Sequence, residues 1–390
     1  MAWEAAFLAG GGMKGRVFVY EFMCGGGMAG EELHVDVAVE GLAMLLASAE
    51  DFSSAGFHTF TTLDPRLLYL KRIFEARSVS VVERGLLEGV EEADWVLLIA
   101  PETGGTLCEL TRTLERSGCS VLGSSSNGVA LATDKGRTLE LAGEAGLSVP
   151  LTLTAKSVEE AVGRAWEVGF PAVFKPVDGV GCEGVSVARG EDDVRGAAEL
   201  ASAASGTGEI LVQEYVKGVD ASASLIVGDD EATPLTLNAQ MILIGEDGRI
   251  RYGGGYLPLK HGLEKEALKA AEKAALQIPG LKGYVGVDLV LSRRGVFIME
   301  VNPRLTTSYL GVREVVEGNI AGFIFDSCLR GVTPGRVVVR GGAAFRKTST
   351  REVCDWEVSI NERHRFIVCR GGSIDEALVK AGIRPRRANL

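Results

Sequence analysis

Apolar residues in the first third of the chain alternate between two periods. Short β-branched or aromatic runs, typical of buried strands, occur at residues 16–22, 58–63, 79–83, 95–100 and 120–123. Between these runs, apolar residues recur with helical spacing, most clearly over residues 32–47 and 107–115. Strands that alternate with helices predict a parallel sheet with helices packed against it, so residues 15–125 are expected to form an α/β domain.

The pattern changes after residue 122, where a Gly-Ser-Ser-Ser-Asn segment leads into a helical stretch that contains Asp134 and Lys135. A second domain is expected to begin here. Strand patterns continue through this part of the chain, and helical periodicity recurs at residues 158–168, 194–203, 263–277 and about 312–329. Residues 341–390 show mixed strand and helix patterns without a recognisable motif.

The segment 286–304 contains two apolar, β-branched runs separated by Ser-Arg-Arg-Gly, which predicts a β-hairpin. A three-residue loop ending at Gly295 would pair Ser292 with Val296. In that register Asp288 lies directly opposite Glu300, at roughly 5 Å. Two carboxylates at this distance repel each other and weaken a sheet unless a cation lies between them.

Asn302 follows Glu300 by two residues and therefore projects from the same face of the strand. With Asp288 these side chains form a set of hard oxygen ligands, which suits Mg²⁺ that carries nucleotide phosphates. The alternative is an ordinary solvated polar face. The apolar neighbours and the Pro303-Arg304 that follows favour the metal site.

A lysine and a glycine-rich loop lie next to each other near the middle of the chain. Lys175 is embedded in the apolar run 172–177, and the loop DGVGCEG precedes the next strand, 185–188. The loop lacks G-K-[ST] and is therefore not a P-loop, but a glycine-rich hairpin loop can fold over phosphates through its amides. Lys175 could extend to the surface, whereas the adjacent loop favours a bound anion.

Two features of the N-terminal part have competing interpretations. Gly25, Gly27 and Gly30 match G-x-G-x-x-G between a strand and a helix, which fits either a dinucleotide site or a tight turn. No acidic residue closes a second strand at the expected distance, which weakens the dinucleotide interpretation. Glu102 follows the strand 95–100 at an edge where open sheets bind ligands; it could contact substrate or interact with a helix dipole.

Composition limits the classes of function. The 390 residues are 46% hydrophobic and 24% charged, as in soluble globular proteins of two or three domains. A net charge of −11 argues against a nucleic-acid partner, which requires a clustered basic face. Seven scattered cysteines favour a reducing cytoplasm without a zinc site. No apolar run approaches the roughly 20 residues of a membrane helix. Residues 1–14 are expected to be either a disordered leader or the result of an upstream start codon, in which case Met13 is the candidate for the true start.

Several motifs, taken in chain order, resemble the ATP-grasp superfamily of carboxylate–amine ligases. They are the lysine in ATDK, the loop in VFKPVDGVGCEGVSV, the hinge VQEYVKGVD, and the pair VDLVL and MEVNPR. The resemblance implies α/β and α+β architecture, with a Rossmann-like N-terminal domain followed by a two-subdomain ATP-grasp fold. The implied divisions are a pre-ATP-grasp domain at 15–125, a small subdomain at 126–212, a large subdomain with the metal site at 213–340, and an extension of unknown role at 341–390.

The residues that this resemblance implies as ATP contacts fall into three groups. The phosphate contacts are Lys135, Lys175 and the loop glycines Gly179, Gly181 and Gly184. The backbone groups that line the adenine pocket belong to Glu214, Tyr215 and Val216. Asp220 takes the ribose hydroxyls.

The resemblance also implies that Asp288, Glu300 and Asn302 bind two Mg²⁺ or Mn²⁺ ions. Arg304 would stabilise the phosphoryl group or an acyl phosphate, together with Lys175. His261 is the only histidine near a predicted motif, and it could be a general base, a phosphate contact or a structural hydrogen-bonding group. The further candidates for substrate contacts are Glu102, Gly26 and Lys260.

Within the superfamily, ASASLIVG, PLTLNAQ, LPLKH, GLKGYVGVDLV and NPRLTTSYLG look most like the tyramine–glutamate ligases of methanofuran biosynthesis. This resemblance implies ATP-dependent amide formation between the γ-carboxylate of L-glutamate and tyramine, by a cytoplasmic protein with small-molecule partners and a homodimer as one expected assembly. The alternatives are a ligase for another amino acid and amine, an ATP-binding regulator without turnover, and a dinucleotide oxidoreductase. The length of the tail departs from the pattern, so its role stays open between assembly, substrate gating and no part in catalysis.

Overall fold

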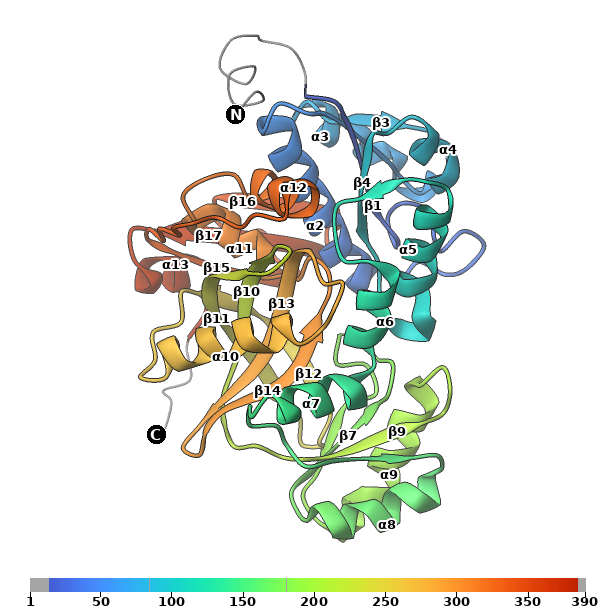
Figure 1. The fold of residues 1–390 in the computed structure, drawn as a ribbon, viewed down its shortest axis with the longest axis vertical. Helices are drawn as coiled ribbons and strands as arrows, with labels where there is room; N and C mark the ends of the chain where they lie inside the picture. The colour runs from blue at the N-terminus through green and yellow to red at the C-terminus, as the bar shows by residue number, and fades with distance from the viewer. Residues whose placement is uncertain (1–13, 84, 180, 385–390) are drawn as a thin grey trace.

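The computed structural model describes residues 14–83, 85–179 and 181–384, so the expected leader lies outside the described residues except for Lys14. The chain folds around three sheets, and the eight-stranded sheet lies between the N-terminal parallel sheet and the four-stranded sheet (Figure 1). None of the helices in the described ranges is long and apolar enough to cross a membrane.

The first sheet is parallel and has the strand order β3-β2-β1-β4-β5. Its strands are β1 (Arg16–Glu21), β2 (His58–Thr62), β3 (Ser80–Val82), β4 (Trp95–Ile99) and β5 (Ser120–Val121). Its helical segments are α2 (Val35–Ser54), η1 (Pro65–Leu70), α3 (Lys71–Glu75), α4 (Leu86–Glu91), η2 (Thr103–Gly105) and α5 (Thr106–Arg116). Along β1, Val17 and Val19 join the core beneath α2, whereas Phe18 and Tyr20 join the opposite core against α5. This two-sided packing confirms the α/β prediction.

Helix α2 extends further than the predicted range 32–47, because its polar C-terminal residues remain buried. Ser48 is satisfied inside the helix, where its hydroxyl donates to the carbonyl of Met44 at 2.7 Å. Asp51 is satisfied by residues from the distant segment that follows residue 308. A periodicity count based on apolar residues alone ends too early at such positions.

The second sheet is small and antiparallel, with the order β6-β9-β7-β8. Helices α6 (Ser126–Thr133) and α7 (Lys135–Glu144) lead into it. It consists of β6 (Thr152–Ala155), β7 (Ala172–Pro176), β8 (Ser186–Ala188) and β9 (Ile210–Glu214), with helices α8 (Val158–Val168) and α9 (Glu191–Ala204). Phe174 and Val212 pack beneath these helices. Their neighbours Lys175 and Gln213 therefore project from the other face of the sheet.

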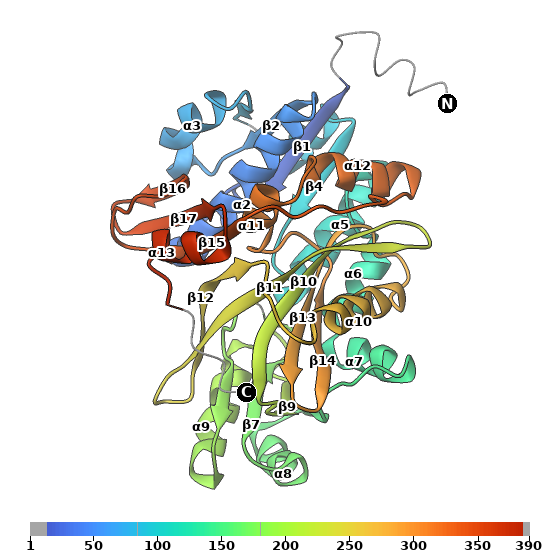
Figure 2. The ribbon, with the colours of Figure 1, turned by 90° about the vertical axis from the view of Figure 1, so that its left-hand side faces the viewer.

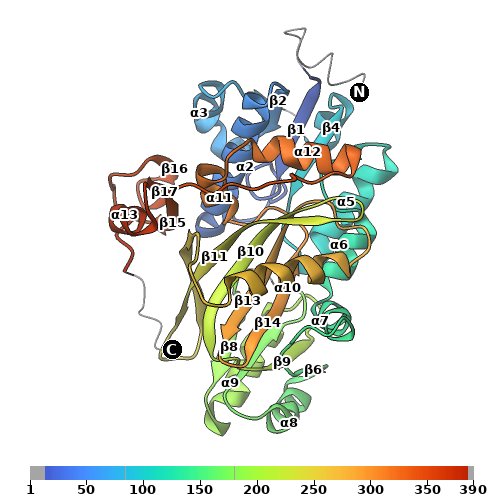
Figure 3. The ribbon, with the colours of Figure 1, turned by 60° about the vertical axis from the view of Figure 1, so that its left-hand side comes forward.

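The third sheet is antiparallel, with the order β14-β13-β10-β11-β12-β15-β17-β16. The first five strands in this order are β10 (Gly218–Val227), β11 (Ala232–Ile244), β12 (Ile250–Leu257), β13 (Gly283–Ser292) and β14 (Gly295–Asn302). Helix α10 (Glu264–Leu276) lies across one face of β10 and β13 (Figure 3), where it packs on Ala223, Val287 and Leu289. Asp288 alternates with these residues and therefore lies on the opposite face. Together with the small sheet, this arrangement confirms the α+β prediction.

The residues after 341 continue the third sheet, since β15 (Gly342–Thr348) pairs with β12. The remaining elements of the tail are β16 (Trp356–Asn361), β17 (His364–Gly371) and α13 (Ile374–Lys380). Figure 2 shows these strands beside α2, and Phe366 and Val368 share one core with that helix. The tail is thus part of the protein's packed interior.

The prediction of one helical stretch over about 312–329 was wrong. The structure has two helices there, α11 (Tyr309–Val315) and α12 (Ile320–Arg330). Gly318 has φ of 110°, which a helix does not permit, and the side chain of Asn319 accepts the N–H of Gly322 at 2.9 Å as an N-cap.

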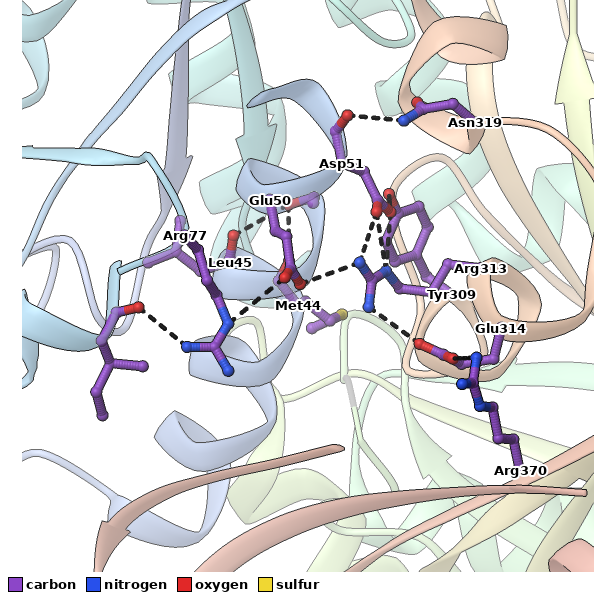
Figure 4. A network of polar contacts seen from close by, with 12 residues as sticks. Met44, Leu45, Glu50, Asp51, Arg77, Tyr309, Arg313, Glu314, Asn319 and Arg370 are labelled. Atoms are coloured by element: carbon purple, nitrogen blue, oxygen red, sulfur yellow. Dashed lines mark hydrogen bonds and ion pairs between the residues drawn. The ribbon is translucent and has the colours of Figure 1, made fainter. Parts of the chain in front are cut away.

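A buried polar network joins α2 to α11 (Figure 4). The guanidinium of Arg313 donates to both carboxylate oxygens of Asp51, with the shortest contact at 2.6 Å, and to Glu50 at 3.1 Å. The hydroxyl of the fully buried Tyr309 also donates to Asp51. The side chain of Asn319 donates to the backbone carbonyl of Asp51 at 2.8 Å. Asp51 of α2 therefore fixes α11 and the start of α12 to the N-terminal domain.

Replacing Asp51 with Asn should destabilise the fold, because Arg313, whose side chain is 13% exposed, loses its main counter-charge. Breaking one side of such a buried pair is expected to lower the free energy of unfolding by about 3 kcal/mol, measured by urea denaturation. Glu159→Gln is the control, since its partner Arg195 and Glu159 itself are 61% and 75% exposed. That control should cost less than about 0.5 kcal/mol, and equal losses in the two variants would contradict the importance given to the network.

Candidate active site

The centre of the candidate site is the pair of carboxylates on the β13–β14 hairpin. Asp288 lies opposite Glu300 and Gly286 lies opposite Asn302 in the antiparallel ladder. The amide of Asn302 donates to Asp288 at 3.3 Å, so its carbonyl oxygen stays available as a ligand. Burial, with repulsion from Glu300 as the second cause, raises the pKa of Asp288 to about 7.

The predicted pairing of the carboxylates is correct, but the predicted turn was wrong. Ser292 pairs with Gly295, not with Val296, so the loop is shorter by one residue than expected. A register shift follows between Asp288 and Leu289, where the facing strand carries an additional residue, Met299. The shorter turn shifts the pairing of the two strands by one residue, and the additional residue Met299 shifts it back, so that Asp288 still faces Glu300.

Gln240 on β11 is a member of this site that the residue pattern did not reveal. Its side-chain amide donates to Asp288 at 2.9 Å, so both oxygens of that carboxylate accept a hydrogen bond from an amide. A single polar residue in a strand gives no indication of which distant residue it faces. Only the pairing of β10 with both β11 and β13 brings Gln240 within reach of Asp288.

Two lysines lie near these carboxylates. Lys135, the first residue of α7, has its ammonium 3.3 Å from Glu300. Lys175 on β7 is buried and donates to the side-chain oxygen of Gln213 at 3.2 Å. Burial lowers the pKa of Lys175 to about 8, against the opposing effects of Glu300 and Asp288. Of the two alternatives, extension to the surface is thus excluded, and Lys175 faces the carboxylates.

The glycine-rich loop between β7 and β8 closes over this cluster. The ammonium of Lys135 donates to the carbonyl of Gly179 at 2.6 Å. Cys182 lies in the loop at φ of 67°, and burial, with Asp288 as the next cause, raises the pKa of its thiol to about 12. Asp178 at the start of the loop accepts the backbone N–H of Gly104 at 3.2 Å. Gly181 and Gly184 belong to the described part of the loop, whereas Val180 lies outside the described residues.

Arg304 reaches from the end of β14 to the N-terminal domain. Its guanidinium donates to both oxygens of Glu102, each at 2.8 Å, and both side chains are buried. Glu102 therefore holds Arg304 in place and does not present a free carboxylate to a substrate. This bidentate geometry fixes the direction of the guanidinium plane.

A small apolar cluster lies beside the charged groups, where Val216, Val290, Phe297 and Met299 pack together. Glu214, just before it, forms an ion pair with Arg294 at 2.7 Å, and the guanidinium of Arg294 lies 4.6 Å from the centre of the Phe297 ring. The backbone N–H of Tyr215 donates to the carbonyl of Pro171 at 3.2 Å. On β10, Asp220 pairs with Val290 in the ladder, and burial raises the pKa of its carboxyl to about 6.

The remaining candidates lie outside this cluster. The ring Nδ1 of His261 accepts the N–H of Leu263 at 3.1 Å, and among the described residues it makes no hydrogen bond or ion pair to the carboxylates. This contact favours the structural role among its alternatives. Lys260 is exposed and lies 3.5 Å from Glu264. Gly26 lies in the turn after β1, at φ of 94°.

The G-x-G-x-x-G match does not have the geometry of a dinucleotide site. Gly25, Gly27 and Gly30 all precede α2, which begins only at Val35, so no glycine opens the helix. A Cβ on Gly25 would lie 2.6 Å from the carbonyl oxygen of Glu21, so this glycine permits a close turn. The structure therefore favours the tight-turn interpretation.

Family models match most of this architecture. A pre-ATP-grasp domain model matches residues 57–129, and an ATP-grasp domain model matches residues 132–308. The second range contains Lys135, Lys175, Asp288, Glu300 and Arg304.

Comparison with known proteins gives the same grouping. The chain is 34% identical over 228 residues to the tyramine–L-glutamate ligase of Methanocaldococcus fervens, a match that covers 57% of this chain and 62% of that protein. It is 30% identical over 251 residues to the enzyme of the same name from Methanocaldococcus jannaschii, covering 64% and 68%. A crystal structure of an ATP-grasp superfamily protein from Archaeoglobus fulgidus superposes with a TM-score of 0.66 at 25% identity, covering 91% of this chain and 99% of that one.

Replacing Asp288 with Asn should raise the melting temperature of the protein in EDTA. The carboxylate is buried opposite Glu300, and its raised pKa means that stability falls as the pH rises toward about 7, so the whole cost is present above neutral pH. A neutral amide removes this cost. Asp247→Asn is the control, since Asp247 is 53% exposed beside Arg249 and should leave the melting temperature unchanged. A lower melting temperature for the Asp288 variant would contradict the electrostatic strain described here.

Proposed function

The chain belongs to the ATP-grasp superfamily, and on that premise we propose that it is an ATP-dependent ligase that joins the γ-carboxylate of L-glutamate to the amine of tyramine. The products would be the γ-glutamyl amide, ADP and phosphate. The observation that carries the proposal is the convergence of Lys135 and Lys175 on Asp288 and Glu300, since buried charges of both signs are costly unless a ligand uses them.

The lysines and the glycine-rich loop are suited to a triphosphate. The ammonium of Lys135 forms an ion pair with Glu300 and donates a hydrogen bond to the carbonyl of Gly179, and phosphate oxygens could replace both contacts. Burial lowers the pKa of Lys175, and an anion beside it would raise that pKa again and so stabilise the charged form. The backbone amides of the loop that contains Gly181 and Gly184 would add neutral donors.

The apolar cluster gives a place for the base of the nucleotide. Val216, Val290, Phe297 and Met299 offer a surface on which an adenine ring can stack. Asp220 lies on the strand next to Val290, at the distance of a ladder neighbour, and its carboxyl could accept ribose hydroxyls. This arrangement would place the triphosphate along the hairpin toward Asp288.

The oxygen donors of the hairpin fit Mg²⁺ or Mn²⁺. Asp288, Glu300 and Asn302 supply too few ligands for an octahedral ion, so phosphate oxygens would complete the shell. Across residues 14–83, 85–179 and 181–384 there is no group of three His, Cys, Asp or Glu side chains that could hold a metal by itself. When bound, such ions offset the charge on the transferring phosphoryl group.

The proposed chemistry has two steps. The γ-carboxylate of glutamate attacks the γ-phosphorus of ATP, the bond to the bridging oxygen breaks, and ADP leaves behind an acyl phosphate. The neutral amine nitrogen then attacks the acyl carbon, phosphate departs with the bond electrons, and the nitrogen loses one proton to the departing phosphate or to solvent. Arg304, fixed by Glu102, and Lys175 would stabilise the phosphoryl oxygens without reorganising.

The specific substrates rest on similarity to the two Methanocaldococcus enzymes, whereas the ATP-dependent step is supported by the match to the ATP-grasp domain model together with the charged cluster. A ligase for a different amino acid and amine would keep the same cluster. A nucleotide-binding protein without turnover would gain nothing from a strained carboxylate pair.

The purified protein should release ADP when ATP, Mg²⁺, L-glutamate and tyramine are all present, and mass spectrometry should detect the γ-glutamyl amide. Asp288→Asn should stay folded and release no ADP, because the oxygen set on the hairpin is incomplete. ADP release with another acid or amine from a panel would replace the substrates but keep the ligase. ATP binding without release for any pair would refute the ligase assignment.

A further inference from the structure

Three neighbouring strands of the parallel sheet each carry an acidic residue at the carboxyl end. Asp64 follows β2, Glu21 ends β1 and Glu102 follows β4, and these strands are adjacent in the order β2-β1-β4. The chain winds from β1 in one direction to β2 and β3, then crosses to β4 and β5 on the other side. Ligands of open parallel sheets bind at this reversal, which here lies between Glu21 and Glu102.

Two of the three acids have an arginine of their own. Glu102 is held by Arg304 at 2.8 Å through both oxygens. Asp64 accepts from the guanidinium of Arg66, also at 2.8 Å, and this contact lowers the pKa of its carboxyl. Both acids are thereby neutralised inside the protein.

Glu21 differs from its neighbours because no cation pairs with it among the described residues. Its side chain is buried, with 4% of the residue exposed, and it accepts the backbone N–H groups of Cys24, at 2.8 Å, and of Met23. Burial raises the pKa of its carboxyl to about 7, and Arg304 exerts only the smallest of the opposing effects. A buried carboxyl group without a counter-charge either stays protonated or is stabilised in its ionised form by a positively charged ligand.

The surrounding backbone keeps room for this carboxylate. A Cβ on Gly41 of α2 would lie 2.6 Å from the carboxyl carbon of Glu21, so any larger residue there would displace it. The turn that folds back over the carboxylate contains Gly25, Gly26 and Gly27, and their lack of side chains lets the backbone pass close to Glu21. The glycine-rich turn that has no role for a dinucleotide thus covers the Glu21 carboxylate.

We propose that Glu21 binds the primary ammonium group of a substrate, at the sheet edge where Arg304 pairs with Glu102. This inference rests on the proposed function, in which both the amino acid and the amine carry such a group. A primary ammonium supplies one charge and three donors, which suits a single carboxylate. A divalent metal would need further oxygen ligands, but the carboxylate oxygens of Glu102 and Asp64 already accept hydrogen bonds from Arg304 and Arg66.

Glu21→Gln tests this role, because the amide keeps an oxygen for the N–H of Cys24 but removes the charge. The KM of the substrate whose ammonium lies at Glu21 should rise by about ten- to a hundredfold, as expected for loss of a charged hydrogen bond. Asp64→Asn is the matched control, an acid at the same sheet edge whose charge serves Arg66, and it should leave both KM values unchanged.

Two assays distinguish the source of the ammonium. Hydroxylamine, uncharged at neutral pH, traps an acyl phosphate as a hydroxamate without any amine substrate. A raised KM for glutamate in the hydroxylamine assay assigns Glu21 to the amino acid. In the complete reaction with both substrates, a raised KM for tyramine alone assigns Glu21 to the acceptor amine. Unchanged KM values for both substrates in a folded Glu21→Gln variant would overturn the proposal while leaving the ligase function intact.

A binding experiment decides the point without turnover. Primary amines and amino acids are compared with their hydroxyl counterparts by thermal shift, in the wild-type protein and in Glu21→Gln. At least one ammonium compound should stabilise the wild-type protein and fail to stabilise the variant. If no ammonium compound does so, the proposal is wrong whatever substrates the ligase reaction uses.

Discussion

The rest of the site depends on the unfavourable pairing of Asp288 with Glu300 across two antiparallel strands. Such a pair weakens the sheet that contains it, and burial increases the cost, as the raised pKa of Asp288 shows. The surrounding structure limits this cost with Gln240, Asn302 and the ammonium of Lys135. A site that stores strain in this form is relieved by a cation, so ligand affinity is gained at the expense of the stability of the empty protein.

The N-terminal domain takes part in this arrangement as a fixed support. Glu102 holds Arg304 just after the hairpin, and Asp51 holds Arg313 and Tyr309 on the next helix. The segment between these two anchors therefore has little freedom. By contrast, the small sheet that carries Lys175 contacts the other parts of the site through the glycine-rich loop, Lys135 and the ion pair of Glu214 with Arg294. The rigid segment that carries Arg304 and the separate small sheet that carries Lys175 would suit the proposed reaction, which relies on positioning.

Hydrophobic periodicity predicted much of the fold. Two short apolar runs with a turn between them predicted the hairpin that carries Asp288 and Glu300. The pairing of Asp288 with Glu300 was correct because a short turn and a bulge at Met299 compensate for each other, which no local pattern reveals. Gln240 was missed because side-chain partners across a sheet depend on strand order. The Asp51–Arg313 contact joins residues 262 positions apart, so sequence spacing carries no signal for it. The ATP-binding roles came from family resemblance, and they stay predictions.

The central claim is that a divalent cation between Asp288 and Glu300 joins the triphosphate to the hairpin. The most direct test is a crystal structure with Mn²⁺ and a non-hydrolysable ATP analogue, in which anomalous scattering locates the metal. The account predicts manganese density between the two carboxylates, with the terminal phosphate within hydrogen-bonding reach of Lys175. Manganese elsewhere in the protein, or a nucleotide bound away from Lys175, would contradict it.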